Sequence, residues 1–263
     1  MAGWESSIGS TLTRGIARGV SDSLAGCELL HLPRRPFDVG LAVAQHAAYR
    51  VALESAGIRV TLLPAEPTLP DAVFVEDAAV VLEEVAVICA MGAPSRRPEI
   101  EGIAQALAGE RPLRRIQSPG TLEGGDVLRA GRRLFVGLSS RTNLEGILQF
   151  AEITQPFGYR VQPVSVRRCL HLKTACTLVG DRLILVNHDW VDPFPFAGFE
   201  LLATPPDEPW GANTLTVNGR VFVAASSPKT ADLLRAKGCD VNALDISELQ
   251  KAEAGLTCLS VLY

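Results

Sequence analysis

A short supersecondary unit recurs along this chain and sets narrow limits on its fold. Each copy is a β-type run, a tight turn and a second β-type run, and several copies are followed by a segment suited to a helix. Four copies are visible: DAAVVLEEVAVICA (77–90), GDVLRAGRRLFVGL (125–138), CTLVGDRLILVN (176–187) and NTLTVNGRVFVAA (213–225). Their spacing of roughly 40 to 50 residues predicts an array or a closed ring, because one hairpin and one helix cannot bury their apolar faces alone.

The turns and the intervening segments support this prediction. Three hairpin turns carry Ala-Gly, Gly-Asp and Asn-Gly, residues that hairpins favour where φ is positive. Helical spacing of apolar residues appears in PEIEGIAQALAG, TNLEGILQFAEI and SPKTADLLRAKG. A first long helix is predicted over 42–57, with Val43, Ala47, Val51 and Leu53 on or near one face.

The two ends of the chain are predicted to form a fifth copy. STLTRGIARGV (10–20) and GLTCLSVL (255–262) would meet there, and a closed ring removes exposed sheet edges. The predicted fold class is therefore α/β, a five-bladed α/β propeller in a single domain over 1–263. An ordinary α/β sandwich is the alternative. CELLHLPRRPFDVG (27–40) is too rich in Pro and Arg to continue a strand or helix and is a candidate mobile lid.

Composition narrows the classes of partner. A net charge of −4 and a pI of about 5.6 give nucleic acid or an anionic membrane nothing general to bind, so a small molecule is expected. The first twenty residues lack the apolar core of a secretory signal, and no stretch reaches the roughly 20 apolar residues of a membrane span, so a cytoplasmic location is expected. The six cysteines are scattered without a CxxC pair, which predicts free thiols.

PDAVFVEDAAVV (70–81) is the most unusual segment chemically. It places Asp71, Glu76 and Asp77 in an apolar, strand-like run around Phe74. On a strand, Asp71 and Asp77 would share a face, and Glu76 would point the other way unless a bulge intervenes. Acids without interleaved Lys or Arg suit a cation, and a planar guanidinium in particular, which a carboxylate binds through two parallel hydrogen bonds. Turn capping by Asp71 and a solvated Glu76 are the alternative.

Two further segments carry candidate chemistry. In TLEGGDVL (121–128), paired glycines allow close backbone approach and leave Glu123 able to hold a neighbouring side chain, with a simple strand kink as the alternative. In CLHLKTAC (169–176), His171 lies alone among apolar residues, which is typical of a core histidine. Cys169 would share a strand face with His171, which leaves a zinc site open, although no further ligands follow at metal-site spacing.

Cys258 is the last candidate. It lies in AGLTCLSVLY, which has the apolar pattern of an interior strand, where a cysteine is usually a small apolar filler. A histidine and an acid from elsewhere in the fold would change this interpretation, because together they activate a thiolate.

Taken together, PDAVFVED, LEGGDVL, VGLSSRTN, LHLKTAC and GLTCLSVL, in this order over most of the chain, resemble the dimethylarginine dimethylaminohydrolase family. That family belongs to the guanidino-group-modifying enzymes with the pentein fold, a five-bladed α/β propeller. The resemblance implies hydrolysis of Nω-methylated arginine to citrulline plus dimethylamine or methylamine, through a covalent thiouronium on a cysteine. It implies a small guanidino amino acid as substrate and no metal, nucleotide or organic cofactor, and it is compatible with a homodimer.

The resemblance also implies roles for matching residues. Cys258 matches the nucleophile, His171 the general acid/base and Glu123 the acid that orients the histidine. The substrate contacts are Asp71, Glu76 and Asp77 on the guanidinium, Phe74 packed beside them, Arg96 and Arg141 on the carboxylate, and the backbone carbonyl of Ala252 on the amino group. Arg97 competes with Arg96 for its role, and either Leu30 or Leu32 would be the lid contact.

Other functions remain open beside this one. A related enzyme could act on arginine or agmatine, but 263 residues leave little room for the additional helical domain usual in arginine deiminases. Agmatine has no carboxylate, so a clamp made by Arg96 and Arg141 argues against it. A non-catalytic propeller that binds a macromolecular partner would have no reason to keep Cys258, His171, Glu123 and the carboxylates together.

Overall fold

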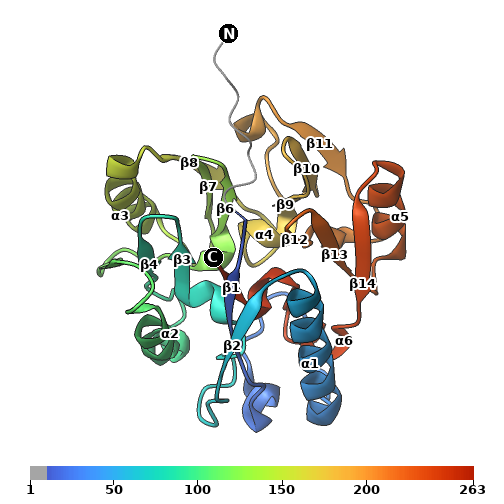
Figure 1. Ribbon diagram of the computed structural model, residues 1–263, viewed down its shortest axis with the longest axis horizontal. Helices are drawn as coiled ribbons and strands as arrows, with labels where there is room; N and C mark the ends of the chain where they lie inside the picture. The colour runs from blue at the N-terminus through green and yellow to red at the C-terminus, as the bar shows by residue number, and fades with distance from the viewer. Residues whose placement is uncertain (1–10) are drawn as a thin grey trace.

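The computed structural model describes residues 11–263 and shows five small sheets arranged around a common centre (Figure 1). Every sheet has three strands, of which two are antiparallel neighbours and the third lies parallel to the middle strand. The sheets are β15-β1-β2, β3-β4-β5, β6-β7-β8, β9-β10-β11 and β12-β13-β14. This arrangement confirms the five-bladed α/β propeller and excludes the sandwich.

The elements are short, as expected for blades of one hairpin and one returning strand. The strands are β1 Arg14–Arg18, β2 Arg59–Leu63, β3 Ala79–Val81, β4 Ala86–Ile88, β5 Leu113–Arg115, β6 Val127–Ala130, β7 Arg133–Leu138, β8 Arg160–Ser165, β9 Cys176–Leu178, β10 Leu183–Val186, β11 Glu200–Ala203, β12 Leu215–Val217, β13 Arg220–Ala224, β14 Asp240–Leu244 and β15 Val261–Leu262. The α-helices are α1 Val39–Ser55, α2 Ile100–Leu107, α3 Leu144–Thr154, α4 Leu172–Ala175, α5 Pro228–Ala236 and α6 Ser247–Gln250. The 3-10 helices are η1 Asp22–Gly26, η2 Val75–Ala78, η3 Pro94–Glu99, η4 Gly124–Asp126, η5 Gln155–Phe157, η6 Phe194–Phe196, η7 Pro209–Ala212 and η8 Thr257–Leu259.

The first blade joins the two ends of the described chain. Antiparallel pairing of β15 with β1 aligns Leu262 with Gly15 and Val261 with Ile16, and β1 pairs in parallel with β2 through its other edge. The C-terminus accordingly lies beside β1 in Figure 1. The predicted fifth copy and ring closure are confirmed from residue 11 onward, whereas Ser10 lies outside the described residues. A single domain over the whole of 1–263 stays a prediction.

Helices cover the outside of four blades (Figure 1). α1, α2, α3 and α5 each connect the second and third strands of a blade, and the segments predicted to be helical are confirmed. The fourth blade carries η6 at the equivalent place between β10 and β11. Within the described part of the chain, no helix is long and apolar enough to cross a membrane.

The hairpin turns agree with the predicted residues at two of three places. Gly131, Asn218 and Gly219 have positive φ, as expected for Ala-Gly and Asn-Gly turns. Gly180 does not, so the prediction was wrong at the Gly-Asp turn. There the hydrogen bond from Val179 N to Leu183 O closes a longer turn, which removes the need for positive φ at the glycine.

The apolar face predicted for α1 is not the face that is buried, apart from Leu53. Val43 and Val51 are exposed, and the buried residues are Ala42, Gln45, His46, Tyr49, Ala52 and Leu53. Polar partners explain the difference: Gln45 Nε2 donates to Ser247 Oγ at 2.9 Å, and Tyr49 Oη lies 2.7 Å from Ser260 Oγ. Hydropathy alone does not reveal such pairs.

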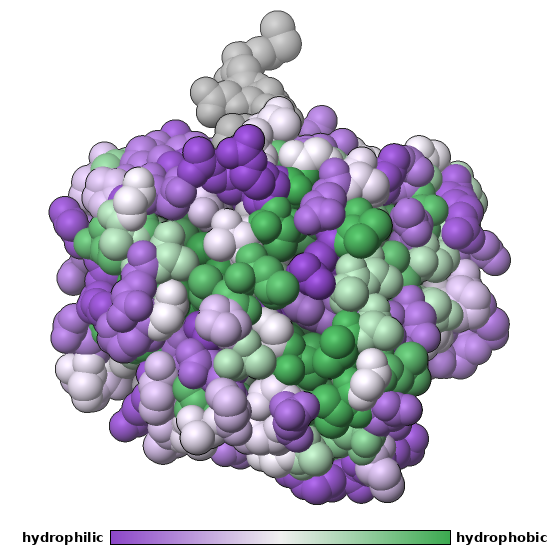
Figure 2. Space-filling model, turned by 60° about the horizontal axis from the view of Figure 1, so that its bottom comes forward, coloured by the Kyte–Doolittle hydropathy of each residue, from purple (hydrophilic) through white to green (hydrophobic). Residues whose placement is uncertain are grey.

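Figure 2, which brings the lower side of Figure 1 forward, shows apolar residues exposed in patches among hydrophilic ones on that side of the molecule.

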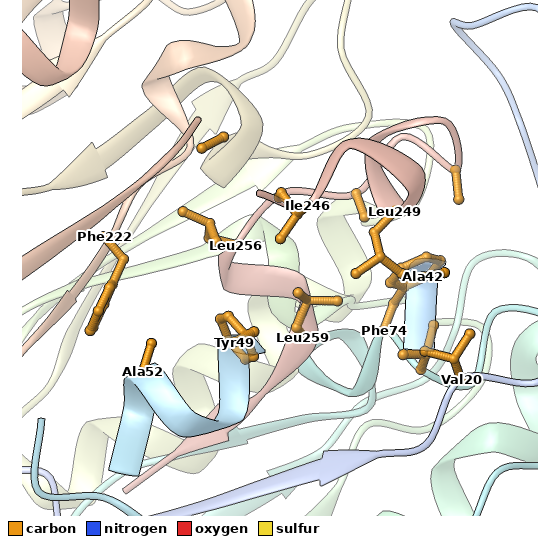
Figure 3. Packing of buried hydrophobic residues seen from close by; sticks show 14 of the residues in the cluster. Val20, Ala42, Tyr49, Ala52, Phe74, Phe222, Ile246, Leu249, Leu256 and Leu259 are labelled. Atoms are coloured by element: carbon orange, nitrogen blue, oxygen red, sulfur yellow. The ribbon is translucent and has the colours of Figure 1, made fainter. Parts of the chain in front are cut away.

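The C-terminal segment is anchored by the largest apolar cluster. Leu256 and Leu259 are fully buried and lie between Phe222 on one side and Phe74 on the other (Figure 3). Cys258 is partly buried and packs against the same cluster. Because each of these large side chains contributes about 2 kcal/mol on burial, the turn that carries Cys258 is held rigidly.

Candidate active site

His171 lies between two carboxylates near the centre of the propeller. Its Nε2 lies 2.7 Å from Glu123 Oε2 and 3.9 Å from Asp77 Oδ1, and all three side chains are buried. Burial alone lowers the pKa of an imidazole, but the charges of Asp77, Asp126 and Glu123 outweigh it and raise the pKa of His171 to about 9. The ring is therefore protonated at neutral pH and can donate a proton.

His171 does not lie on a strand. It is the residue before α4, in an extended conformation, and its carbonyl accepts a hydrogen bond from Cys169 Sγ at 3.5 Å. Burial raises the pKa of the Cys169 thiol to about 12. The predicted shared strand face was therefore wrong, and the Cys169 sulfur is engaged with the backbone of His171 rather than aligned beside its ring. Among the described residues, the group with metal-ligand spacing is Asp77, Glu123 and His171.

Two glycines allow Glu123 and His171 to meet Asp77. A Cβ on Gly124 would lie 2.0 Å from the carbonyl oxygen of Glu76. A Cβ on Gly125 would lie 2.7 Å from both Asp77 Oδ1 and His171 Nδ1. The Gly125 N–H also donates to Asp77 Oδ1 at 3.0 Å. The EGGD sequence is thus more than a strand kink, because the backbone of η4 packs directly against the imidazole of His171.

We expect Gly125→Ala to destabilise the protein by about 1–3 kcal/mol and to lower kcat by about tenfold or more, because the new methyl group displaces His171. Denaturant unfolding and turnover measure the two effects. Gly109→Ala is the matched control, since nothing lies within 4 Å of its Cβ position. Equal behaviour of the two variants would contradict the packing argument.

Asp126 is a site residue that the sequence interpretation missed. Its carboxylate accepts from Leu172 N at 2.9 Å and from Ser139 Oγ at 2.6 Å, which ties the start of α4 to β7 and the turn after it. Burial raises the pKa of Asp126 to about 6. The signal was present in the fourth letter of EGGD, but nothing in the sequence indicated that its partner is the residue after His171.

Glu76 and Asp77 lie on η2 and not on the predicted strand. A turn of 3-10 helix buries both carboxylates together, whereas a strand would have pointed them to opposite faces. Glu76 Oε1 accepts from Lys173 Nζ at 2.5 Å, and Glu76 Oε2 accepts from Thr257 Oγ1 at 2.8 Å. Glu76 therefore links the segment of His171 to the segment of Cys258.

Cys258 lies in η8, where the sequence predicted a strand. It is half-buried, and the Gly255 N–H donates to its Sγ at 3.4 Å. Burial and the negative charges of Glu76 and Asp77 raise the pKa of this thiol to about 12. The cysteine is thus neither sealed in the core nor ionised in the free protein. The carboxylates that suppress its ionisation are the same ones that would attract a cation to it.

The two predicted clamp arginines both lie near Glu123, with Arg96 Nη1 3.9 Å from Glu123 Oε2, but they differ in their other hydrogen bonds. Arg141 Nη1 lies 3.4 Å from Glu123 Oε1, and among the described residues its guanidinium has no other hydrogen-bond partner. Arg96 donates to Asp77 at 2.8 Å, to both oxygens of Glu99 and to the carbonyl of Phe74. Arg97 is exposed, so the geometry favours Arg96 over it at this site.

The remaining predicted contacts lie around the same region. Asp71 is buried and accepts the Glu28 N–H at 3.0 Å, and burial raises its pKa. The side chain of Phe74 belongs to the apolar cluster under Cys258. Ala252 is buried, and its carbonyl accepts no hydrogen bond from residues 11–263. A free carbonyl at this place suits the predicted contact with an amino group.

A five-bladed α/β propeller with a cysteine, a histidine and several acids around its centre defines a pentein. Residues 39–193 match the family described as N,N dimethylarginine dimethylhydrolase, eukaryotic. This match covers more than half of the chain. The protein belongs to the dimethylarginine dimethylaminohydrolase family.

Individual relatives support the same assignment. The chain is 39% identical to N(G),N(G)-dimethylarginine dimethylaminohydrolase of Streptomyces coelicolor over 94% of its length and 96% of that protein. It is 34% identical to the enzyme of the same name from Pseudomonas aeruginosa, over 96% and 98% of the two chains. A crystal structure of the Pseudomonas aeruginosa protein, a cysteine-to-serine mutant complexed with citrulline, superposes with a TM-score of 0.91 at 32% identity, covering 96% of this chain and all of the other.

Proposed function

We propose that this protein hydrolyses Nω-methylated arginine to citrulline and dimethylamine or methylamine. The observation that carries the proposal is the pair of acids on η2: Glu76 contacts the segments of Cys258 and His171, and Asp77 lies 3.9 Å from the His171 ring. A flat cation bound to these acids would lie between a sulfur and a protonated imidazole. Citrulline bound to the Pseudomonas aeruginosa relative supports a ureido amino acid as product.

The substrate supplies the charge that activates Cys258. In the free protein, burial, Glu76 and Asp77 hold the pKa of the thiol near 12, so the neutral form dominates at pH 7. A guanidinium bound to the same carboxylates neutralises them and stabilises the thiolate electrostatically. Ionisation of Cys258 is thereby coupled to binding of a cationic substrate, which protects the thiol from unproductive reactions.

The reaction then proceeds in two halves. The Cys258 sulfur attacks the guanidinium carbon, whose plane the carboxylates hold, and His171 gives its proton to the departing methylated nitrogen. The amine leaves, and an S-alkylthiouronium remains on the cysteine. Neutral His171 takes a proton from water, the resulting hydroxide adds to the same carbon, and the thiolate departs. The added hydroxyl gives its proton to solvent or to the released amine, which leaves the neutral ureido group. Glu123 keeps the imidazole oriented throughout.

We expect a substrate panel to favour methylated arginines over agmatine by at least about 100-fold in kcat/KM, because agmatine has no carboxylate for Arg141 to bind. Citrulline, carbamoylputrescine and released amine are quantified for dimethylarginine, monomethylarginine, arginine and agmatine. Arginine is the control for the methyl groups, and faster turnover of arginine would identify a deiminase. Turnover of agmatine alone would overturn the substrate assignment. No turnover of any guanidine would favour a binding protein.

We further propose that the protein acts as one catalytic domain in the cytoplasm. All six cysteines are free thiols, and a reducing compartment keeps Cys258 available as a nucleophile. The chemistry uses only side chains of this chain, so the prediction of no metal or organic cofactor is kept. A homodimer stays a prediction.

A further inference from the structure

One carboxylate joins the lid to the segment of the nucleophile. The predicted lid covers residues 27–40, of which Val39 and Gly40 begin α1; the name lid is kept here for residues 27–38, which have no regular secondary structure and connect η1 to α1. Three successive N–H groups in it, those of Leu30, His31 and Leu32, donate to Glu253 Oε1 at 2.9, 2.5 and 2.7 Å. Consecutive amides that converge on one oxygen form an anion-binding concavity. Here the anion is the carboxylate of Glu253 in the same chain.

The backbone conformation of Glu253 is unusual for a residue with a side chain. It has a φ of 60°, a conformation that non-glycine residues rarely adopt. The residue is 8% exposed, and Oε2 is buried without a hydrogen-bond partner among the described residues. A long acidic residue at such a place is unfavourable unless the side chain makes contacts that a glycine would lose.

The position of Glu253 connects the lid to the proposed chemistry. It directly follows Ala252, whose carbonyl is the predicted acceptor of the substrate amino group, and lies five residues before Cys258. On the other side of the lid, the Glu28 N–H donates to Asp71. The middle of the lid, with both candidate substrate leucines, is thus anchored to the nucleophile segment, and its first residues are anchored to a predicted guanidinium contact.

We propose that Glu253 is a positioning residue that holds the lid closed by accepting the backbone N–H groups of Leu30, His31 and Leu32. It acts on the substrate only through the lid and takes no part in bond making. The contact itself is a property of the unliganded protein. Its consequence for turnover rests on the proposed function, since the lid leucines would otherwise have no substrate to cover.

The test uses Glu253→Gly, which removes the side chain while relieving the positive φ, so that the protein keeps its fold. Glu253→Gln is the conservative variant, because its amide oxygen can still accept hydrogen bonds. Glu200→Gln is the control, since Glu200 forms an exposed pair with Lys237 on another blade. Hydrogen exchange of lid amides is measured without substrate, and kcat and KM are measured with dimethylarginine.

We expect amides 30–32 to exchange at least about tenfold faster in Glu253→Gly, with the protection of the other blades unchanged. KM should rise at least about tenfold, because the variant loses three hydrogen bonds to one charged acceptor, whereas kcat should change less than about threefold. Glu253→Gln should lie between this variant and the parent, and Glu200→Gln should match the parent.

Unchanged exchange of the lid amides in Glu253→Gly would overturn the proposal. So would faster exchange spread over all blades, because that result would identify a general loss of stability. A fall in kcat at constant KM would also overturn it, since the residue would then act on the chemistry. If the parent protein turned over no guanidine, the proposed function would fail, while the exchange measurement would still decide whether Glu253 holds the lid.

Discussion

Replacing Cys258 with serine is expected to lower kcat for dimethylarginine by at least about 10⁴-fold, because the thiouronium needs a sulfur at this position. A hydroxyl is a far weaker acid than a thiol, so a bound guanidinium cannot ionise it at neutral pH. Substrate binding should persist, since Asp71, Glu76 and Arg141 remain in place. Steady-state kinetics and calorimetric binding separate these two effects.

Mass spectrometry tests whether Cys258 is the residue that forms the covalent intermediate. Protein quenched during turnover should carry an adduct on the peptide that contains Cys258, and the serine variant should carry none. Cys239→Ser is the control, because Cys239 is also a half-buried free thiol but lies directly before β14, away from the site residues. An adduct on another cysteine, or turnover by Cys258→Ser near the parent rate, would exclude the covalent mechanism.

His171→Gln is expected to lower kcat by about 10³-fold, since the same ring donates a proton to the amine and then accepts one from water. In the parent protein, activity should fall as pH rises through about 9, where His171 loses the proton that it must donate. The exposed His188 provides the control variant His188→Gln. If His171→Gln kept the pH profile of the parent, His171 would not be the group that transfers the proton.

The raised pKa of His171 also predicts how stability depends on pH. An ordinary histidine titrates near 6.5, so the contribution of the protonated ring is fully present below that pH and is lost as pH rises to about 9. The difference in unfolding free energy between the parent and His171→Gln should therefore shrink by about 3 kcal/mol over this interval. Denaturant unfolding at pH 6 and pH 9 measures it, and a constant difference would show that the ring is not held as a cation.

Much of the fold followed from local patterns. Hairpin turns, helical spacing and the interval between copies are properties of neighbouring residues, so the blades and the closing of the ring by the two chain ends could be predicted. The motifs around Cys258, His171 and Glu123 also identified the family. Local patterns misjudged the conformations within the site, where the predicted strands around Asp77, His171 and Cys258 are 3-10 turns or the start of a short helix.

The sequence alone determined which residue types are available for chemistry and in which segments of the repeating unit they lie. Only the tertiary structure decided how they act together: that Glu76 links two segments, that Asp126 holds the start of α4, that most donors of Arg96 are occupied, and that Glu253 holds the lid. The physical reason is separation along the chain. The contact between Leu30 and Glu253 joins residues 223 positions apart, and no periodicity or propensity specifies such a pair before the ring has closed.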